Sequence, residues 1–236
     1  EKYPMRNGKN VYALLALTTA LWGTLYVANR VLLDVFPGFV LLFLRYFIAA
    51  AAMTAIQRFR AAEHIERPRR IERTDWKYII LFGVGGYVVS IGLQQYGTKL
   101  AGASLASLIN CMNPIAICFF AVLLLHEHMT AKKIVCIASA VAGAACIVGG
   151  DAGGGHVLGI AFSFGSVLVW SVVSVFMRSF TQKYDALTVT TYGIYVAAAC
   201  TLPFAVHELM TTPGLDLLHA RHIVVLLYVG LLCTAL

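Results

Sequence analysis

The chain has 236 residues, of which 60% are hydrophobic and only 12% are charged, and its mean hydropathy is +0.80. Soluble globular domains carry about 25% charged residues, so this composition excludes a soluble enzyme or a soluble binding domain. The net charge of +7 does not indicate a nucleic-acid-binding protein, because the basic residues gather in short segments between apolar ones.

Seven long apolar segments follow one another along the chain. A helix needs about 20 apolar residues to cross the hydrocarbon core of a bilayer, and in lipid every backbone polar group must be satisfied within the protein. We therefore predict an all-α membrane protein, a multi-span helical bundle. In chain order the predicted spans are Asn10–Leu33, Phe39–Gln57, Tyr78–Tyr96, Ala101–Leu125, Ile134–Gly150, Val157–Met177 and Leu187–Val206. Ile223–Leu236 is also apolar but too short to cross, and we predict that it starts an eighth span.

The basic residues predict the orientation of this bundle. Of the 18 Lys and Arg residues, 14 precede span 1 or follow spans 2, 4 and 6, and these segments all lie on one side of the membrane if the spans alternate. Cytoplasmic loops are enriched in Lys and Arg, so we place the N-terminus in the cytoplasm and the protein in the cytoplasmic (inner) membrane. The most basic loop, residues 58–77, is interpreted as the topology determinant, and a patch for lipid headgroups is the alternative.

The sequence repeats itself at an offset of 148 residues. The aligned residues are Trp22 and Trp170, Val27 and Val175, Ala49–Ala51 and Ala197–Ala199, and, at an offset of 147, Ile79–Gly83 and Leu226–Gly230. The unit contains five predicted helices, so the second copy starts on the opposite side of the membrane and has inverted topology, as in many secondary transporters. The first repeat is residues 10–150. The second, residues 156–236, holds two helices and the start of a third, which predicts a fragment or an incomplete form of a ten-helix protein.

Three motifs stand in the order and spacing of a known family. Trp22–Thr24 has the pattern W-G-[ST], Arg45–Ala50 has the pattern R-[FY]-x-x-A-A, and Ala103–Pro114 has the pattern A-S-x-A-x-L followed by proline. Together they resemble the first, second and fourth helices of the EamA-like drug/metabolite transporters. Glu127 matches the acidic residue that closes the fourth helix, and His126 stands where the family usually has glycine.

The resemblance covers the whole chain. It implies ten helices in two inverted EamA units and the export or exchange of small metabolites. The substrates of this family include amino acids, nucleosides, sugar phosphates and drugs, so the resemblance names no substrate.

The centre of span 4 carries a proline next to two asparagines. Pro114 has no N–H, so the carbonyl of Asn110 loses its helical partner, and Asn110 and Asn113 share a face of the helix because they are three residues apart. Broken helices at mid-depth are tolerated where they line a cavity or are covered by protein. We predict that the two asparagines coordinate a substrate and that Pro114 is a hinge. A proline kink whose asparagines bond a neighbouring helix is the alternative.

Arg45 lies well inside a predicted span. Burying it in lipid costs about 2.5 kcal/mol or more, so it is expected to face the interior, where a guanidinium suits a carboxylate or a phosphate. A structural ion pair, with Asp34 as the candidate, is the alternative. Asn29, Gln94 and Gln95 lie at similar depth, and together with Arg45 they could form a polar outer vestibule. Each could instead make a hydrogen bond between helices.

The repeat-related Trp22 and Trp170 both fall near the middle of a span, although Trp usually prefers the membrane interface. They are expected to form aromatic walls around an organic substrate, with ordinary packing as an equal alternative. Ser171 in span 6 and Tyr192 in span 7 add hydroxyl groups that could bind the substrate or serve close packing. No Asp or Glu falls in the middle of a complete predicted span, which argues against a carboxylate proton relay there.

Together these features predict a secondary transporter that exports or exchanges a small polar solute, amino-acid-like or otherwise, by alternating access. A passive channel and an intramembrane lipid-modifying enzyme are the alternatives, and no acid–base pair at membrane depth supports the enzyme. The expected partners are the small-molecule substrate and the lipid bilayer, while a coupling proton or ion and a homodimer are left open. We expect no cofactor, no metal, no nucleic acid and no enzymatic activity.

Overall fold

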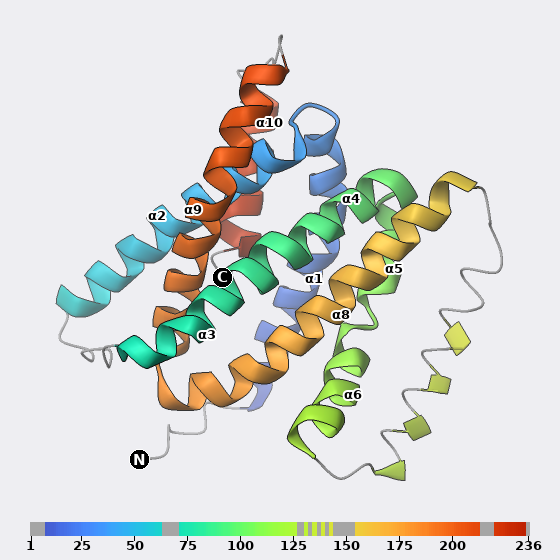
Figure 1. The fold of residues 1–236 in the computed structure, drawn as a ribbon, viewed down its shortest axis with the longest axis vertical. Helices are drawn as coiled ribbons and strands as arrows, with labels where there is room; N and C mark the ends of the chain where they lie inside the picture. The colour runs from blue at the N-terminus through green and yellow to red at the C-terminus, as the bar shows by residue number, and fades with distance from the viewer. Residues whose placement is uncertain are drawn as a thin grey trace.

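A computed structural model of the chain describes residues 8–62, 71–126, 130–131, 134–135, 138–139, 142–143, 154–212 and 220–234. Within these residues the chain forms helices and contains no strand (Figure 1). In chain order the helices are α1 (Gly8–Leu33), α2 (Gly38–Ala62), η1 (Arg73–Asp75), α3 (Trp76–Leu81), η2 (Phe82–Ser90), α4 (Ile91–Ala101), α5 (Ala103–Asn110), α6 (Asn113–Leu125), α8 (Gly154–Lys183), α9 (Ala186–Thr211), α10 (Ala220–Leu227) and η3 (Tyr228–Thr234). Segments η2 and η3 are π-helical.

Five helical stretches are long and apolar enough to cross a membrane. They are Gly38–Ala62, Arg73–Ala101, Ala103–Leu125, Val157–Lys183 and Ala186–Thr211. These stretches coincide with predicted spans 2, 3, 4, 6 and 7, and α1, with 26 residues, covers the first, so the predicted all-helical membrane bundle is confirmed. Most of the predicted fifth span, Ile134–Gly150, lies outside the described residues. His222–Thr234 forms a shorter apolar helix where the eighth span was predicted to start.

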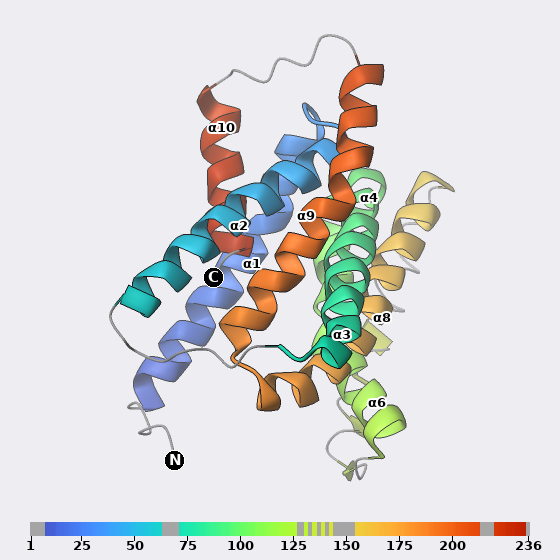
Figure 2. The same cartoon turned by 60° about the vertical axis from the view of Figure 1, so that its left-hand side comes forward.

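Helices α2 and α9 pack against each other in opposite directions (Figures 1 and 2). Ala49 of α2 and Ala197 of α9 are fully buried in one apolar cluster, so the small residues allow close approach. At one end of the pair, the Glu208 carboxylate accepts two backbone N–H groups at the start of α2, at 2.8 and 3.1 Å. At the other end, Nη1 of Arg60 lies 3.9 Å from Oδ2 of Asp185. The N-terminus of each helix therefore meets the C-terminus of the other.

Two glycines in the π-helical segments make matching contacts with these helices. A Cβ at Gly83 of η2 would lie 2.8 Å from the carbonyl oxygen of Gly193 on α9. A Cβ at Gly230 of η3 would lie 3.4 Å from the carbonyl oxygen of Arg45 on α2. The two glycines, Gly83 and Gly230, are related by the sequence offset of 147, and their contact partners, Arg45 and Gly193, are related by the offset of 148. Helices α1 and α8, the first helices of the two copies, also run in opposite directions (Figure 2).

Two residues with positive φ end helices of the first copy. Gly102, with φ 85°, makes the tight turn between α4 and α5, and His126, with φ 53°, ends α6. Glycine adopts this left-handed conformation without steric cost, whereas other residues rarely do. This explains why the family resemblance places glycine at position 126. Because the His126 side chain is exposed, the substitution crowds no packed interface.

Candidate functional site

The fourth predicted span is broken in its middle. Helix α5 ends at Asn110, α6 begins at Asn113, and Pro114 falls in the first turn of α6, where an N–H would have no helical acceptor. Nδ2 of Asn113 donates to Oδ1 of Asn110 at 3.1 Å, and Nδ2 of Asn110 donates to the carbonyl oxygen of Ala106 at 3.1 Å. The side chains of the two asparagines therefore bridge the break.

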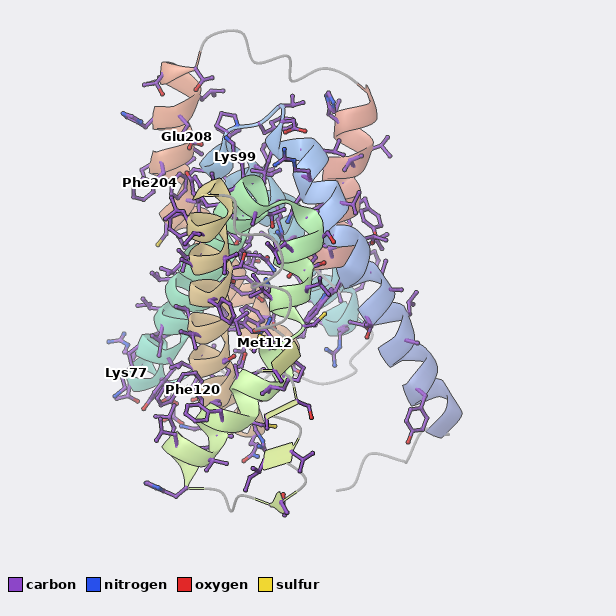
Figure 3. All side chains as sticks on the ribbon, turned by 90° about the vertical axis from the view of Figure 1, so that its right-hand side faces the viewer. Lys77, Lys99, Met112, Phe120, Phe204 and Glu208 are labelled. Carbon is purple, nitrogen blue, oxygen red and sulfur yellow. The ribbon has the colours of Figure 1, made fainter. Side chains whose placement is uncertain are left out.

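Figure 3 places this break between the two ends of the bundle. Lys99 and Glu208 lie at one end, Lys77 lies toward the other, and Met112, in the turn between α5 and α6, lies between them. At membrane depth, irregular backbone is tolerated where it is buried in protein or lines a cavity. At the break the side chain of Asn110 is buried and that of Asn113 is half-buried, while Cys111 and Pro114 are exposed.

Gln94 of α4 connects the break to α1. Its Nε2 donates to the hydroxyl of Tyr26 at 2.5 Å and to Oδ1 of Asn110 at 3.4 Å. Tyr26, Gln94 and Asn110 are each no more than 8% exposed. We call Tyr26, Gln94, Asn110 and Asn113 the amide cluster. It joins α1 and α4 to both halves of the broken span.

A second polar group of the candidate site is Arg45 of α2. It is 2% exposed, and its Nε donates to Oγ1 of Thr234 in η3 at 2.6 Å. Segment η3 in turn packs against α1, the helix that carries Tyr26. No acidic side chain in the described ranges pairs with Arg45, and Asp34, the expected candidate, lies 3.9 Å from Arg30 instead. The guanidinium therefore has no counter-charge in the described part of the bundle.

Several buried polar atoms around the break have no hydrogen-bond partner among the residues that the structure describes. They include Nη1 of Arg45, Oε1 of Gln94 and Oδ1 of Asn113. Asn29, fully buried three residues after Tyr26, has no partner for either amide atom. Most buried polar groups in proteins are hydrogen-bonded, and leaving one unpaired costs about 1–3 kcal/mol. The site thus offers a cationic donor and amide acceptors to a bound molecule.

The two repeat-related tryptophans have different surroundings. Trp22, one helical turn before Tyr26 on α1, is 52% exposed. Trp170 of α8 lies edge-on to Tyr87, with ring centroids 6.2 Å apart. Of the two, Trp170 is therefore the one that packs against another aromatic side chain among the described residues.

Ser171 and Tyr192 make no hydrogen bond with the amide cluster. Ser171 is fully buried in α8, and its hydroxyl has no partner within the described ranges. Tyr192 packs edge-on against Trp76 at the start of α3, with ring centroids 5.3 Å apart, beside the apolar cluster around Ile79. Of the residues predicted from the sequence, the structure therefore brings together Gln94 of span 3 with Asn110 and Asn113 of span 4, whereas Tyr192 makes a separate contact.

Two residues of the site are missed by reasoning from the sequence. Tyr26 lies three residues before Asn29 and so shares its face of α1, which is a signal that the sequence does carry. Thr234 has no such signal, because it meets Arg45 across 189 residues of chain. Its position depends on how η3 packs against α2.

The fold and the site together define a multi-pass, α-helical membrane protein with a buried polar cluster between the two ends of its bundle. The chain belongs to the EamA-like transporter family, whose sequence profile matches residues 10–149 and 157–236. Membership in this family makes the protein a membrane transporter.

Similar proteins agree with this assignment. Curated relatives named uncharacterized transporters occur in Archaeoglobus fulgidus, at 23% identity over 86% of this chain and 70% of the relative, and in Clostridium kluyveri, at 23% identity over 96% and 74%. The uncharacterized transporter YvbV of Bacillus subtilis is 24% identical over 74% of this chain and 55% of its own length. A protein crystal structure with 21% identity covers 93% of the chain at a TM-score of 0.65 and shares the fold. The chain thus spans 55% to 74% of the length of these relatives.

Proposed function

We propose that the protein is a secondary transporter that exports or exchanges a small polar metabolite across the cytoplasmic membrane by alternating access. The observation that carries this proposal is that Arg45 Nη1, Gln94 Oε1 and Asn113 Oδ1 are buried and have no partner among the described residues. Polar atoms at membrane depth are costly unless they find a partner. A polar substrate that enters the bundle is the partner that satisfies them.

In this proposal the amide cluster binds the substrate. Gln94, Asn110 and Asn113 contribute amide groups from three helices, α4, α5 and α6, and Asn29 extends the polar surface along α1. Pro114 prevents α5 and α6 from becoming one continuous helix, so the two halves of the span can tilt relative to each other. The break would then be both the binding point and the hinge.

Two inverted repeats, residues 10–150 and 156–236, would supply the alternating movement. The opposite directions of α1 and α8 and of α2 and α9 support this arrangement (Figures 1 and 2), as do the matching contacts of Gly83 and Gly230. When two such copies exchange conformations, a site between them opens to the other side of the membrane. The basic loops support a cytoplasmic N-terminus.

Counterflow in proteoliposomes of the full-length protein tests this function. Vesicles are loaded with one solute at high concentration, and uptake of the labelled solute is followed for amino acids, organic acids, nucleosides and sugar phosphates. We expect transient, saturable uptake of at least one compound and none into protein-free liposomes. Absence of counterflow for the whole panel would contradict the proposal. Flux that does not saturate and shows no counterflow would indicate a passive channel.

A further inference from the structure

Arg45 carries a charge that the described protein does not neutralise. It is the one charged side chain that is buried among the described residues. A guanidinium is not deprotonated in proteins, so it cannot avoid the cost of burial by losing its charge. Nε is satisfied by Thr234 at 2.6 Å, whereas Nη1 has no partner in the described ranges. An anionic group bound at Nη1 would neutralise the guanidinium. In the proposed transport function, the solute that enters the bundle carries this group.

The position of the second copy that corresponds to Arg45 carries no charge. Gly193 of α9 is the counterpart of Arg45, and its carbonyl makes the contact with η2 that the Arg45 carbonyl makes with η3. A Cβ at Gly193 would lie 2.7 Å from the ring of Phe82 and 3.4 Å from the ring of Tyr87. Two aromatic rings of the first copy thus pack against Gly193 of the second, whereas the counterpart of Gly193 in the first copy carries a guanidinium. Tyr87 is itself the counterpart of Thr234, at an offset of 147.

The other end of the site accepts hydrogen bonds. Oε1 of Gln94 and Oδ1 of Asn113 are buried acceptors without a donor among the described residues. Tyr26 bonds Gln94 at this end, and its helix α1 packs against η3, where Thr234 holds Arg45. A molecule that fits both ends carries one anionic group and, apart from it, at least one N–H or O–H donor.

We propose that the transported solute is an organic monoanion, whose carboxylate or singly charged phosphate binds Arg45 and whose hydrogen-bond donors bind Gln94 and Asn113. This inference rests on the proposed transport function. A second negative charge would have no cation to meet in the described core, and a cation would meet the guanidinium with like charge. The site therefore selects by charge as well as by shape.

Ligand-induced stabilisation of the purified full-length protein in detergent tests the charge rule. Each N-acetyl-L-amino acid and short 2-hydroxy acid, a monoanion with an N–H or O–H donor, is measured beside its primary amide, which removes the negative charge with little change in size. Dicarboxylates, phosphate monoesters and primary amines form the remaining arms. A ligand that binds the folded state raises the melting temperature according to RT ln(1 + [L]/Kd). We expect stabilisation by one or more monoanions and none by the matched amides.

Three substitutions at the site and one control separate recognition from folding. Arg45→Gln is expected to weaken binding of the stabilising monoanion about 10- to 100-fold, the loss typical of a hydrogen bond to a charged group. Arg58→Gln makes the same change at an exposed position of the same helix and should leave binding unchanged. Arg45→Lys keeps the charge, and Thr234→Val keeps the guanidinium without its Nε partner. Both variants should still prefer monoanions, with lower affinity than the wild type. They therefore test the role of Arg45 even if Arg45→Gln does not fold.

Several outcomes would overturn the inference. The first is that neutral, cationic or dianionic compounds stabilise the wild-type protein and monoanions do not. The second is that no compound of the panel stabilises it. The third is that Arg45→Gln binds a monoanion as tightly as the wild type does. The transporter assignment survives these results if some solute still shows saturable counterflow. Absence of counterflow for every compound removes the proposed function itself.

Discussion

Adding one methyl group at Gly83 should force η2 and α9 apart. The Cβ of Gly83→Ala would lie 2.7 Å from Cβ and Cγ1 of Val196 and 2.8 Å from the carbonyl oxygen of Gly193. Carbon atoms in contact prefer about 3.5–4.0 Å, and neither a Cβ nor a carbonyl can rotate away. Such overpacking costs about 3 kcal/mol at the upper end of the usual range, and replacing a helical glycine returns about 1 kcal/mol. We therefore expect a net destabilisation of about 2 kcal/mol.

The measurement is the melting temperature of the purified protein in detergent, with Gly23→Ala as the matched control. A destabilisation of about 2 kcal/mol corresponds to a decrease of about 4–8 °C for a chain of this length. Gly230→Ala should show a similar decrease, because its Cβ would lie 2.8 Å from Cγ2 of Ile48. A Cβ at Gly23 meets nothing within 4 Å, so this variant should melt at or slightly above the wild-type temperature. Equal melting temperatures for Gly83→Ala and Gly23→Ala would refute the packing argument.

Three further predictions concern the helix contacts, the hinge and the topology. Glu208→Ala should lower the melting temperature by the equivalent of about 1 kcal/mol, the usual cost of losing a helix cap, whereas Glu208→Gln keeps an acceptor and should lose less. Pro114→Ala supplies the missing N–H and lets α5 continue into α6, so the rate of counterflow should fall while binding affinity in the melting assay stays the same; an unchanged rate would argue against the hinge. In a cysteine-free version, Lys99→Cys should react with an impermeant maleimide on intact cells and Lys77→Cys only after permeabilisation, and the reverse pattern would invert the assigned topology.

The helices and the break could be predicted because their causes are local in the sequence. Long apolar segments predict spans wherever lipid is the solvent, and Pro114 predicts a break because proline lacks an N–H. The glycine usually found at position 126 also has a local cause, the left-handed backbone at the end of α6. Among the spans that the structure describes, the exact helix ends differ from the prediction: α9, for example, runs to Thr211 and includes Glu208, which lies beyond the predicted span.

The contacts between spans could not be predicted in this way. The pairing of Arg45 with Thr234 depends on the packing of η3 against α2, and the pairing of Tyr192 with Trp76 depends on the packing of α9 against α3. Hydropathy shows that such residues are in a span, but it does not show which partner they meet. The internal repeat narrows the choice, because each contact in one copy suggests its counterpart in the other.

The central claim is that the amide cluster at the broken span binds the transported solute. Its most direct test is the concentration dependence of counterflow for the wild type and for Asn110→Leu, with Gln182→Leu, at an exposed position of α8, as the control. We predict that Asn110→Leu raises the half-saturating concentration at least about 10-fold, as expected when buried hydrogen bonds are left unpaired, while Gln182→Leu behaves like the wild type. An Asn110→Leu protein that transports with wild-type half-saturation and rate would contradict the account.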